Sequence, residues 1–320
     1  MTILTIITIF TIIYYMARRQ GLAFGLGILI FTGLALADLS FAGLAYGNYP
    51  MSFENNGRIL TIKKLPKKAL VYGVPAAEIM VSLGLAQTVV GFSYKNGELD
   101  PPHKEALKDT PLIESYHDES RLIDKGADFI IGRFALNSPE LIRGWPPVYV
   151  LGSVTLENFF QQIRELGEIF QIPERSALIL ADLNARLFKV TKRLEEYEPV
   201  KALVYDPRAD GIYVPGQEDF ATRLVNLAGG VNVFSDRKEW SVATPEEIWD
   251  RQPLAIIVPD YGDSQAELKV ARLKADPILS KLVAVETDKI LVIPLINLGP
   301  GVRVATAVES LAKFFHPSLF

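Results

Sequence analysis

Arginine and aromatic residues recur in this chain just after short apolar runs that have the character of buried strands. Arg presents planar, forked donors to carboxylate or phenolate oxygens, and Tyr and Trp offer a broad contact face with a polar group at its edge. In open α/β sheets, ligands bind outside the carboxyl ends of the strands. The residues at these positions are Tyr94, Lys95, Tyr116 and Arg133 in the first half and Arg208, Tyr213, Trp240, Tyr261 and Arg303 in the second. Together they suit a bulky, anionic or conjugated ligand.

Residue sets for catalysis or direct metal binding are poorly represented. The three histidines are His103, His117 and His316, and there is no cysteine, so a zinc site would need all three histidines and a carboxylate. His316 stands beside Pro317 at the carboxyl end, which makes such convergence a poor expectation. Gly152-Ser153 lacks the Gly-x-Ser-x-Gly pattern of a nucleophile elbow. We therefore expect no metal ligands, no catalytic residues and no resident cofactor, and hence not an enzyme.

The elements that would position these residues alternate between strand and helix, which predicts parallel α/β layers. Asn56-Gly57, ahead of the alternating run 58–62, predicts a β-hairpin. The expected strands are 69–72, 89–92, 111–113, 128–131, 148–151, 202–205, 255–258 and 290–293. The expected helices begin at Pro75 and cover 159–170, 219–228, 264–274 and 303–315.

One helix is expected to be much longer than the others. It opens at Pro173, a favourable first-turn residue, and its helix-forming composition continues to about Glu198 without Gly or Pro. We predict two doubly wound α/β lobes, 46–172 and 199–320, joined by this rigid linking helix at 173–198. A single large α/β enzyme domain with a long peripheral helix is the alternative.

Residues 1–45 have the features of an export signal. Met16-Ala17-Arg18-Arg19 forms a positively charged n-region, and residues 21–36 form an uncharged, apolar h-region. Candidate cleavage sites with small residues follow at 35–37 and 43–45. We expect Met16 to be the true start, with 1–15 upstream of it. The alternative is an uncleaved membrane anchor at 21–37, because about 20 apolar residues span a bilayer. Without a cysteine the chain lacks the lipid attachment residue of a bacterial lipoprotein, so we expect a periplasmic protein that is not a lipoprotein.

The charge balance argues against nucleic acid as a partner. The chain carries a net charge of −4, and residues 1–45 contribute +1 through Arg18, Arg19 and Asp38, which leaves −5 on the remainder. Proteins that bind nucleic acid need a basic footprint. We expect an acidic, two-lobed monomer whose partner is a small molecule.

Taken in order, many short segments resemble one family, the ABC-transporter substrate-binding proteins with a single long inter-lobe helix, which bind ferric siderophores, haem and cobalamin. The matching segments are 57–58 with 68–73, 75–79, 83–85 and 89–91, then 122–123 with 127–132, 214–216, 227–232, Trp240 and 300–303. Ala127 stands where the family pattern usually has proline. The resemblance covers nearly all of the chain after residue 45.

The resemblance implies capture of a ligand in a cleft between the lobes and docking on a membrane permease. Arg303 matches the family's carboxyl-terminal arginine turn, which strengthens its place among the ligand-binding residues. The family uses one glutamate on each lobe for docking. Glu246 matches the second position, whereas the first falls on Ser120, with Glu119 as the neighbouring candidate. An acid that merely favours the positive end of a helix is the alternative for both.

The ligand we expect from this resemblance is an iron–siderophore complex. Haem is a narrower alternative, since Tyr94, Tyr116 or His117 could supply an axial ligand; cobalamin and oxyanions are others. An exported or anchored α/β hydrolase is the alternative from a different class, and a sensor with the same fold is a third.

Overall fold

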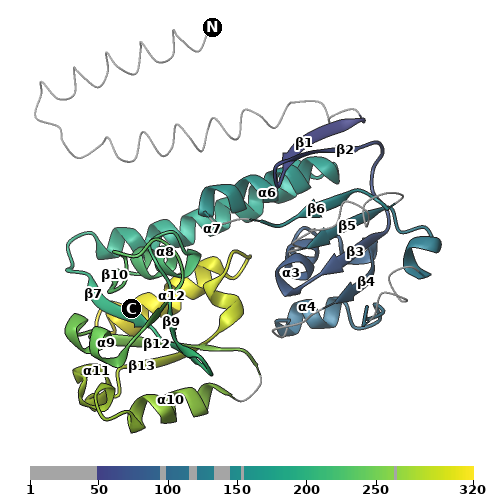
Figure 1. Cartoon of the computed structure of the whole chain (residues 1–320). Helices are drawn as coiled ribbons and strands as arrows, with labels where there is room; N and C mark the ends of the chain where they lie inside the picture. The colour runs from purple at the N-terminus through teal and green to yellow at the C-terminus, as the bar shows by residue number, and fades with distance from the viewer. Residues whose placement is uncertain (1–48, 94–98, 115–120, 133–144, 153–154, 263–264) are drawn as a thin grey trace, which may run out of the picture. The chain divides into compact units, whose positions relative to one another are not determined.

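The computed structural model describes residues 49–93, 99–114, 121–132, 145–152, 155–262 and 265–320 (Figure 1). The expected export signal at 1–45 lies outside the described residues. Within the described ranges, no helix is both long enough and apolar enough to cross a bilayer.

The chain enters through a β-hairpin, as the Asn56-Gly57 signal predicts. Strand β1 (Met51–Asn55) pairs antiparallel with β2 (Arg58–Ile62), and Asn55 lies opposite Arg58. Asn56 and Gly57 both have positive φ, at 54° and 74°, as a tight type I′ turn requires. Asn55 fastens the hairpin to the first lobe: its side chain accepts from the backbone N of Val150 at 2.8 Å and donates to the backbone O of Val150 at 3.0 Å.

The N-terminal lobe contains a four-stranded parallel sheet in the order β4-β3-β5-β6. Its strands are β3 (Ala69–Tyr72), β4 (Val89–Ser93), β5 (Phe129–Gly132) and β6 (Val148–Val150). The helices whose bounds the structure describes are α3 (Val74–Ser82), α4 (Pro101–Ala106) and α6 (Leu156–Ile169), with a short 3-10 turn at Ala86–Thr88. Residues 121–124 are also helical. The predicted strand at 111–113 contributes only a single bridge between Phe92 and Leu112, because Pro111 has no N–H to extend a ladder.

The C-terminal lobe repeats the same strand order. Its parallel sheet runs β10-β7-β12-β13, built from β7 (Val200–Val204), β10 (Gly230–Asn232), β12 (Ala255–Asp260) and β13 (Ile290–Pro294). In each lobe, therefore, the second strand lies on one side of the first and the third strand on the other. Such a sheet has a switch point between its first and third strands, where ligands bind in doubly wound folds. In this lobe, the switch point lies between β7 and β12.

A second, antiparallel sheet of order β11-β9-β8 accompanies the C-terminal lobe. It consists of β8 (Asp206–Arg208), β9 (Gly211–Val214) and β11 (Ser241–Ala243). The helices of the lobe are α8 (Phe220–Leu227), α9 (Pro245–Arg251), α10 (Gln265–Ala275), α11 (Val283–Glu286) and α12 (Val304–Phe315). Short 3-10 turns occupy Leu279–Lys281 and Leu295–Leu298.

The linking helix α7 spans Pro173–Leu194, 22 residues or about 33 Å at the usual rise (Figure 1). It ends four residues earlier than predicted, and 195–197 form a turn ahead of β7. Helix α7 packs against α6 of the first lobe and against α8 and α12 of the second. Its buried stripe of Leu180, Leu183, Leu187, Val190 and Leu194 joins one hydrophobic core that includes residues of both lobes. The link is therefore a packed core element.

Candidate functional site

The predicted residues Arg208, Tyr213 and Tyr261 lie together at the carboxyl edge of the second lobe's parallel sheet. Arg208 is in β8, which begins two residues after β7 ends, and Tyr261 directly follows β12. Tyr213 is in β9, where it lies opposite Asp206 in the register with β8. The cluster is therefore at the switch point between β7 and β12.

The fully buried Asp206 organises this cluster. Its Oδ2 accepts from Arg208 Nε at 3.0 Å and from the Tyr261 hydroxyl at 2.8 Å, and it lies 2.9 Å from Arg208 Nη2. Its Oδ1 accepts from Lys269 Nζ at 2.8 Å. Lys269, on α10, also donates to the backbone O of Pro259 at 2.8 Å, and its ammonium lies 4.1 Å from the centre of the Tyr261 ring. Every polar atom of the Asp206 carboxylate thus has a cationic or hydroxyl donor.

The electrostatics of the cluster follow from these contacts. Burial by itself raises the pKa of Asp206, but hydrogen bonds from Lys269 and Tyr261 outweigh it, and the pKa lies below its ordinary value. Burial and the bond to this carboxylate raise the pKa of Tyr261, so its phenol keeps its proton. Burial lowers the pKa of Arg208, but its bonds to Asp206 outweigh this and the net pKa is raised. Asp206 is therefore a carboxylate at neutral pH and Arg208 a cation.

Arg303, the other predicted arginine of the second half, is engaged in a separate ion pair. It precedes α12 and reaches Glu78 of α3, with its Nε 3.0 and 2.9 Å from the two carboxylate oxygens and a further bond from Nη2. Its Nη1 lies 3.2 Å from Asp100. The side chains of Arg303 and Glu78 are 12% and 1% exposed. The structure therefore places Arg303 in a buried ion pair with two acids of the N-terminal lobe.

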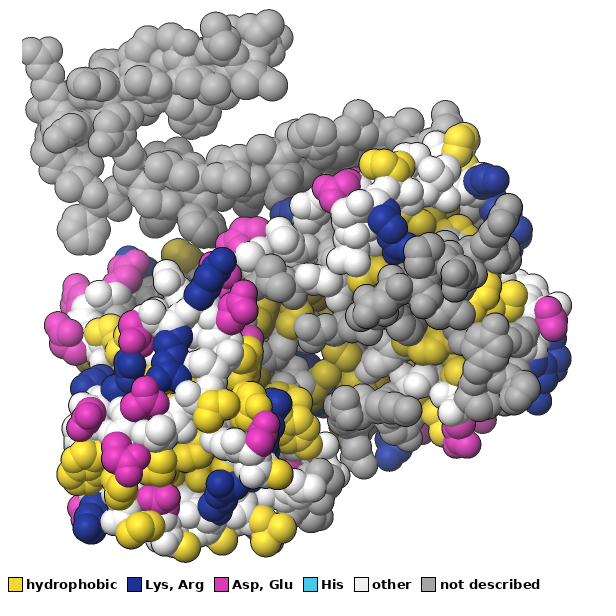
Figure 2. All heavy atoms as spheres, in the orientation of Figure 1, with side chains coloured by type: hydrophobic (Ala, Val, Ile, Leu, Met, Phe, Trp, Pro, Cys, Tyr) yellow, Lys and Arg dark blue, Asp and Glu magenta, His cyan; other side chains and the backbone are white. Residues whose placement is uncertain are grey.

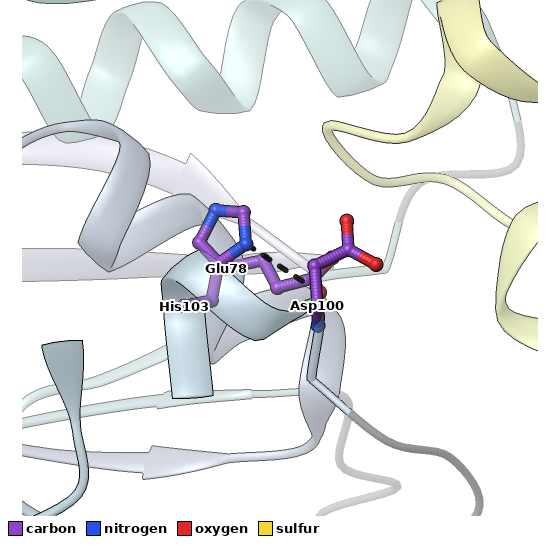
Figure 3. A group of neighbouring side chains, drawn as sticks. All are labelled: Glu78, Asp100 and His103. Atoms are coloured by element: carbon purple, nitrogen blue, oxygen red, sulfur yellow. Dashed lines mark hydrogen bonds and ion pairs between the residues drawn. The ribbon is translucent and has the colours of Figure 1, made fainter. Parts of the chain in front are cut away.

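Glu78, Asp100 and His103 form a group whose side chains could together hold a metal ion (Figure 3). His103 Nδ1 is buried without a hydrogen bond and lies 3.8 Å from Glu78 Oε1, while its Nε2 is 3.1 Å from the Ser82 hydroxyl. The guanidinium of Arg303, however, already contacts both carboxylates. A divalent ion there would face that fixed positive charge, so Arg303 takes the place that a metal would need.

A cavity of about 380 Å³ adjoins this ion pair. It is lined by Ser82, Asp100 and His103 of the first lobe, by Asp182 and Arg186 of α7, and by Arg303 and Thr306 of the second lobe. Its two arginines are both paired, since Arg186 bonds to Glu309 at 2.9 and 2.6 Å. The cavity thus lies between the lobes beside α7 and presents charges that are already neutralised.

Comparison with known proteins identifies the family. Residues 76–295, more than half of the chain, match the model of the periplasmic binding protein family. The chain belongs to this family. The predicted resemblance to two-lobed periplasmic substrate-binding proteins is thereby confirmed.

Individual members of the family are distant in sequence. The chain is 22% identical to the uncharacterized ABC transporter substrate-binding lipoprotein YvrC of Bacillus subtilis (strain 168), over 85% of this chain and 87% of that protein. A periplasmic binding protein from Veillonella parvula has the same fold, with TM-score 0.75 and 24% identity over 83% of this chain and 97% of the other. The structure of an ABC-type Fe3+-hydroxamate transport system from Saccharomonospora viridis gives TM-score 0.71, 22% identity and coverage of 84% and 99%.

Two further predicted residues of this periplasmic binding protein, Trp240 and Glu246, do not join the cluster. Trp240 donates its indole N–H to Asp219 at 2.5 Å, at the start of α8. Glu246 is exposed in the first turn of α9, where its neighbour Glu247 completes a capping box with Thr244. Tyr94, Lys95, Tyr116, Arg133 and Glu119 lie outside the described residues, so their predicted roles remain predictions.

Sequence reasoning missed Lys269 and Glu78 as parts of the site, whereas Asp206 stands with Arg208 among the strand-end residues. Lys269 carried a usable signal. Ala266, Lys269 and Leu273 are the buried residues of α10, at the spacing of one helical face, so a lysine stands in an apolar stripe. A charged residue in such a stripe needs a buried partner. Glu78 similarly falls among the buried apolar residues of α3.

Proposed function

We propose that this protein captures a ferric-siderophore-type complex outside the cytoplasm and delivers it to the membrane permease of an ABC importer. The observation that carries the proposal is the Arg208–Asp206–Tyr261 cluster at the switch point of the second lobe's sheet. Doubly wound folds bind their ligands at that position. The guanidinium of Arg208 and the rings of Tyr213 and Tyr261 match the oxygen-rich, conjugated surface of an iron complex.

The two-lobed architecture supports capture and release. A packed linking helix permits only a small hinge motion compared with flexible crossover strands. The described part of the chain presents charges of both signs interspersed on the face shown in Figure 2, without a continuous basic stripe. This agrees with the proposal that the partners are a small metal complex and a permease, and not nucleic acid; we propose that the protein acts as a monomer.

Haem, cobalamin and oxyanions are narrower alternatives within the same function. Haem-binding proteins occur among the solved structures with this fold. The residues predicted as axial ligands for haem lie outside the described part of the chain, so the proposal rests on the second lobe. The carboxylates of haem would suit Arg208 as well as phenolate oxygens do. The ligand panel below distinguishes these ligands.

Docking on the permease is assigned to Glu246 in the second lobe. Among the contacts of the described residues, its carboxylate has no hydrogen bond or ion pair, whereas Glu247 bonds to Arg237 at 2.7 Å. Glu246 is therefore available to an arginine of a membrane partner. The equivalent role of Glu119 in the first lobe remains part of the proposal.

We also propose that the protein is exported to the periplasm without a lipid anchor. The sequence has no cysteine, the residue to which such an anchor is attached, although YvrC is a lipoprotein by its name. Mass spectrometry of the exported protein tests this: a mature amino terminus near Asp38 or Tyr46 supports cleavage, and retention of residues 21–37 supports an uncleaved anchor.

The test of ligand capture is a thermal-shift panel of ferric catecholate and hydroxamate siderophores, haemin and cyanocobalamin. We expect an iron complex to raise the melting temperature of the wild type and to do so less in Arg208→Gln. Arg303→Ala is a poor test variant, because it would leave Glu78 buried and unpaired and so destabilise the fold. If no complex shifts the melt and the protein hydrolyses an ester or a phosphate, the hydrolase alternative replaces this proposal.

A further inference from the structure

We infer that buried Asp206 and Lys269 are positioning residues that hold Arg208 ready for an anionic oxygen of the ligand, and that the ligand is therefore an anionic complex and not a neutral one. This rests on the proposed capture function and narrows it to a class of ligand: complexes that present carboxylate or phenolate oxygens.

The triad of Arg208, Asp206 and Lys269 carries a net positive charge. Lys269 and Arg208 are cations and Asp206 is a single anion, so the three side chains keep one uncompensated positive charge. Lys269 is 8% exposed and Asp206 is fully buried, whereas Arg208 is 47% exposed. The excess charge is therefore presented to solvent at Arg208 alone. If Asp206 merely neutralised Arg208, the pair would carry no net charge and a neutral ligand would fit as well.

The side chain of Arg208 is held in one orientation by its neighbours. Its Nε and Nη2 both contact Asp206, its Cζ lies 4.3 Å from the centre of the Tyr213 ring, and its backbone O accepts from Arg272 at 2.9 Å. Among the contacts of the described residues, its Nη1 has none. A guanidinium held in one orientation with a free donor loses little conformational entropy when it binds, which is how preorganised groups gain affinity.

Lys269 contacts buried groups of the cluster and orients the Asp206 carboxylate. Its ammonium donates hydrogen bonds to Asp206 and to the backbone O of Pro259, which are both buried, and it packs on the Tyr261 ring. Burying a lysine costs free energy unless it is paired. The two oxygens of the Asp206 carboxylate have different donors. Oδ1 accepts from Lys269, and Oδ2 accepts from Arg208 and Tyr261. Lys269 thereby orients the carboxylate that orients Arg208.

Among the described residues, the hydroxyls of Tyr213 and Tyr261 also form hydrogen bonds at this cluster. The Tyr213 hydroxyl donates to Asp210 at 2.7 Å, and both groups are on the solvent side of the cluster. The Tyr261 hydroxyl donates to Asp206 and lies 3.4 Å from Arg208 Nη2. The guanidinium of Arg208 lies over the Tyr213 ring, and its Nη2 contacts the Tyr261 hydroxyl. Among the contacts of the described residues, Nη1 is the donor left for the ligand.

The experiment compares two iron probes, a trianionic ferric triscatecholate and the uncharged trishydroxamate ferrichrome, by isothermal titration. We expect the wild type to bind the triscatecholate more tightly. Lys269→Met should weaken that binding about tenfold or more and leave binding of ferrichrome unchanged, since a charge-assisted bond loses its support. Lys274→Met is the matched control: it removes a half-exposed lysine of the same helix that pairs with Asp288, and it should change neither affinity.

Asp206→Asn separates positioning from charge. The variant raises the net charge of the triad, so a purely electrostatic site would bind the triscatecholate more tightly, whereas positioning predicts about tenfold weaker binding. Arg208→Lys tests the same point if Asp206→Asn fails to fold, because it keeps the charge but cannot bridge Asp206 and a ligand. Lys269→Arg, which keeps a positive charge at this position, should retain the wild-type preference for the triscatecholate over ferrichrome.

Each other outcome has a definite meaning. Equal or tighter binding of the triscatecholate by Asp206→Asn, or by Arg208→Lys in its place, overturns the positioning role. Tighter binding of ferrichrome than of the triscatecholate by the wild type overturns the anionic class and leaves the proposed capture of iron complexes intact. Binding of neither probe, nor of any complex in the thermal-shift panel, overturns the capture function itself.

Discussion

Arg303 and Glu78 form a buried ion pair although 225 positions separate them in the chain. The guanidinium contacts both carboxylate oxygens and, through Nη1, Asp100. The pair joins the start of α12 to α3. Gly301 lies close to Pro75 of α3: a Cβ added to this glycine would be 3.9 Å from the proline ring. The ion pair thus joins the two lobes beside the cavity next to α7.

The first prediction concerns the stability that this pair provides. Arg303→Gln should lower the free energy of unfolding by about 3–5 kcal/mol, because it leaves the Glu78 carboxylate buried without its partner. The double variant Glu78→Gln/Arg303→Gln should lose much less than the sum of the two single variants. Urea denaturation measures both. Lys192→Gln, which breaks an exposed pair with Glu195, should cost less than about 1 kcal/mol.

A loss of less than about 1 kcal/mol in Arg303→Gln would contradict the buried pairing. The pair also bears on the predicted ligand contact of Arg303. An anionic ligand would have to compete with Glu78 and Asp100 for the same guanidinium, whereas Arg208 has a free donor. That prediction therefore stays a prediction, with Arg208 the better supported of the two.

The second prediction is a pH dependence from Asp206. Its folded-state pKa lies below the unfolded value of 3.8, so its stabilising contribution is present above that value and is lost as the pH falls through the folded-state pKa. Between about pH 5 and pH 2, the wild type should lose more stability than Asp206→Asn. Urea unfolding at several pH values measures the difference between the two curves, and parallel curves would exclude this role for Asp206.

Much of the fold was predictable because its signals are local. The predicted strands at 69–72, 128–131 and 255–258 contain the buried apolar runs 69–71, 129–131 and 255–258, and the Asn56-Gly57 turn needs only two residues of positive φ. The end of α7 was less predictable. Residues 195–198 are helix-forming, and the chain leaves the helix there to begin β7.

The antiparallel sheet of β8, β9 and β11 was missed for a physical reason. Its strands are three or four residues long, and Pro207 and Gly211 are weak strand formers. The pairing of Arg303 with Glu78 was equally invisible, because no local pattern relates residues so far apart. Strand ends did predict Arg208, Tyr213 and Tyr261, but not that Trp240 would bond to Asp219 instead of joining them.

The third prediction concerns the hairpin that opens the described chain. Asn55 is 3% exposed and makes two hydrogen bonds to the backbone of Val150. Asn55→Ala should destabilise the protein by about 2–4 kcal/mol, because it strands a buried N–H and weakens the bonding of a carbonyl. Chemical denaturation measures the loss. Ser52→Ala, which removes an exposed hydroxyl contact with Thr61 in the same hairpin, should change stability by no more than about 0.5 kcal/mol.

The fourth prediction concerns docking through Glu246. Glu246→Lys should reduce delivery of ligand to a reconstituted permease and ATPase, because it places a like charge against the arginines expected on the membrane partner. Its affinity for the ligand should be unchanged, since the side chain is exposed in α9 and does not contact the Arg208 cluster. Glu267→Lys is the matched control, an exposed acid in the first turn of α10. Transport that falls equally in both variants would point to net charge, and undiminished transport in Glu246→Lys would remove this residue from the docking surface.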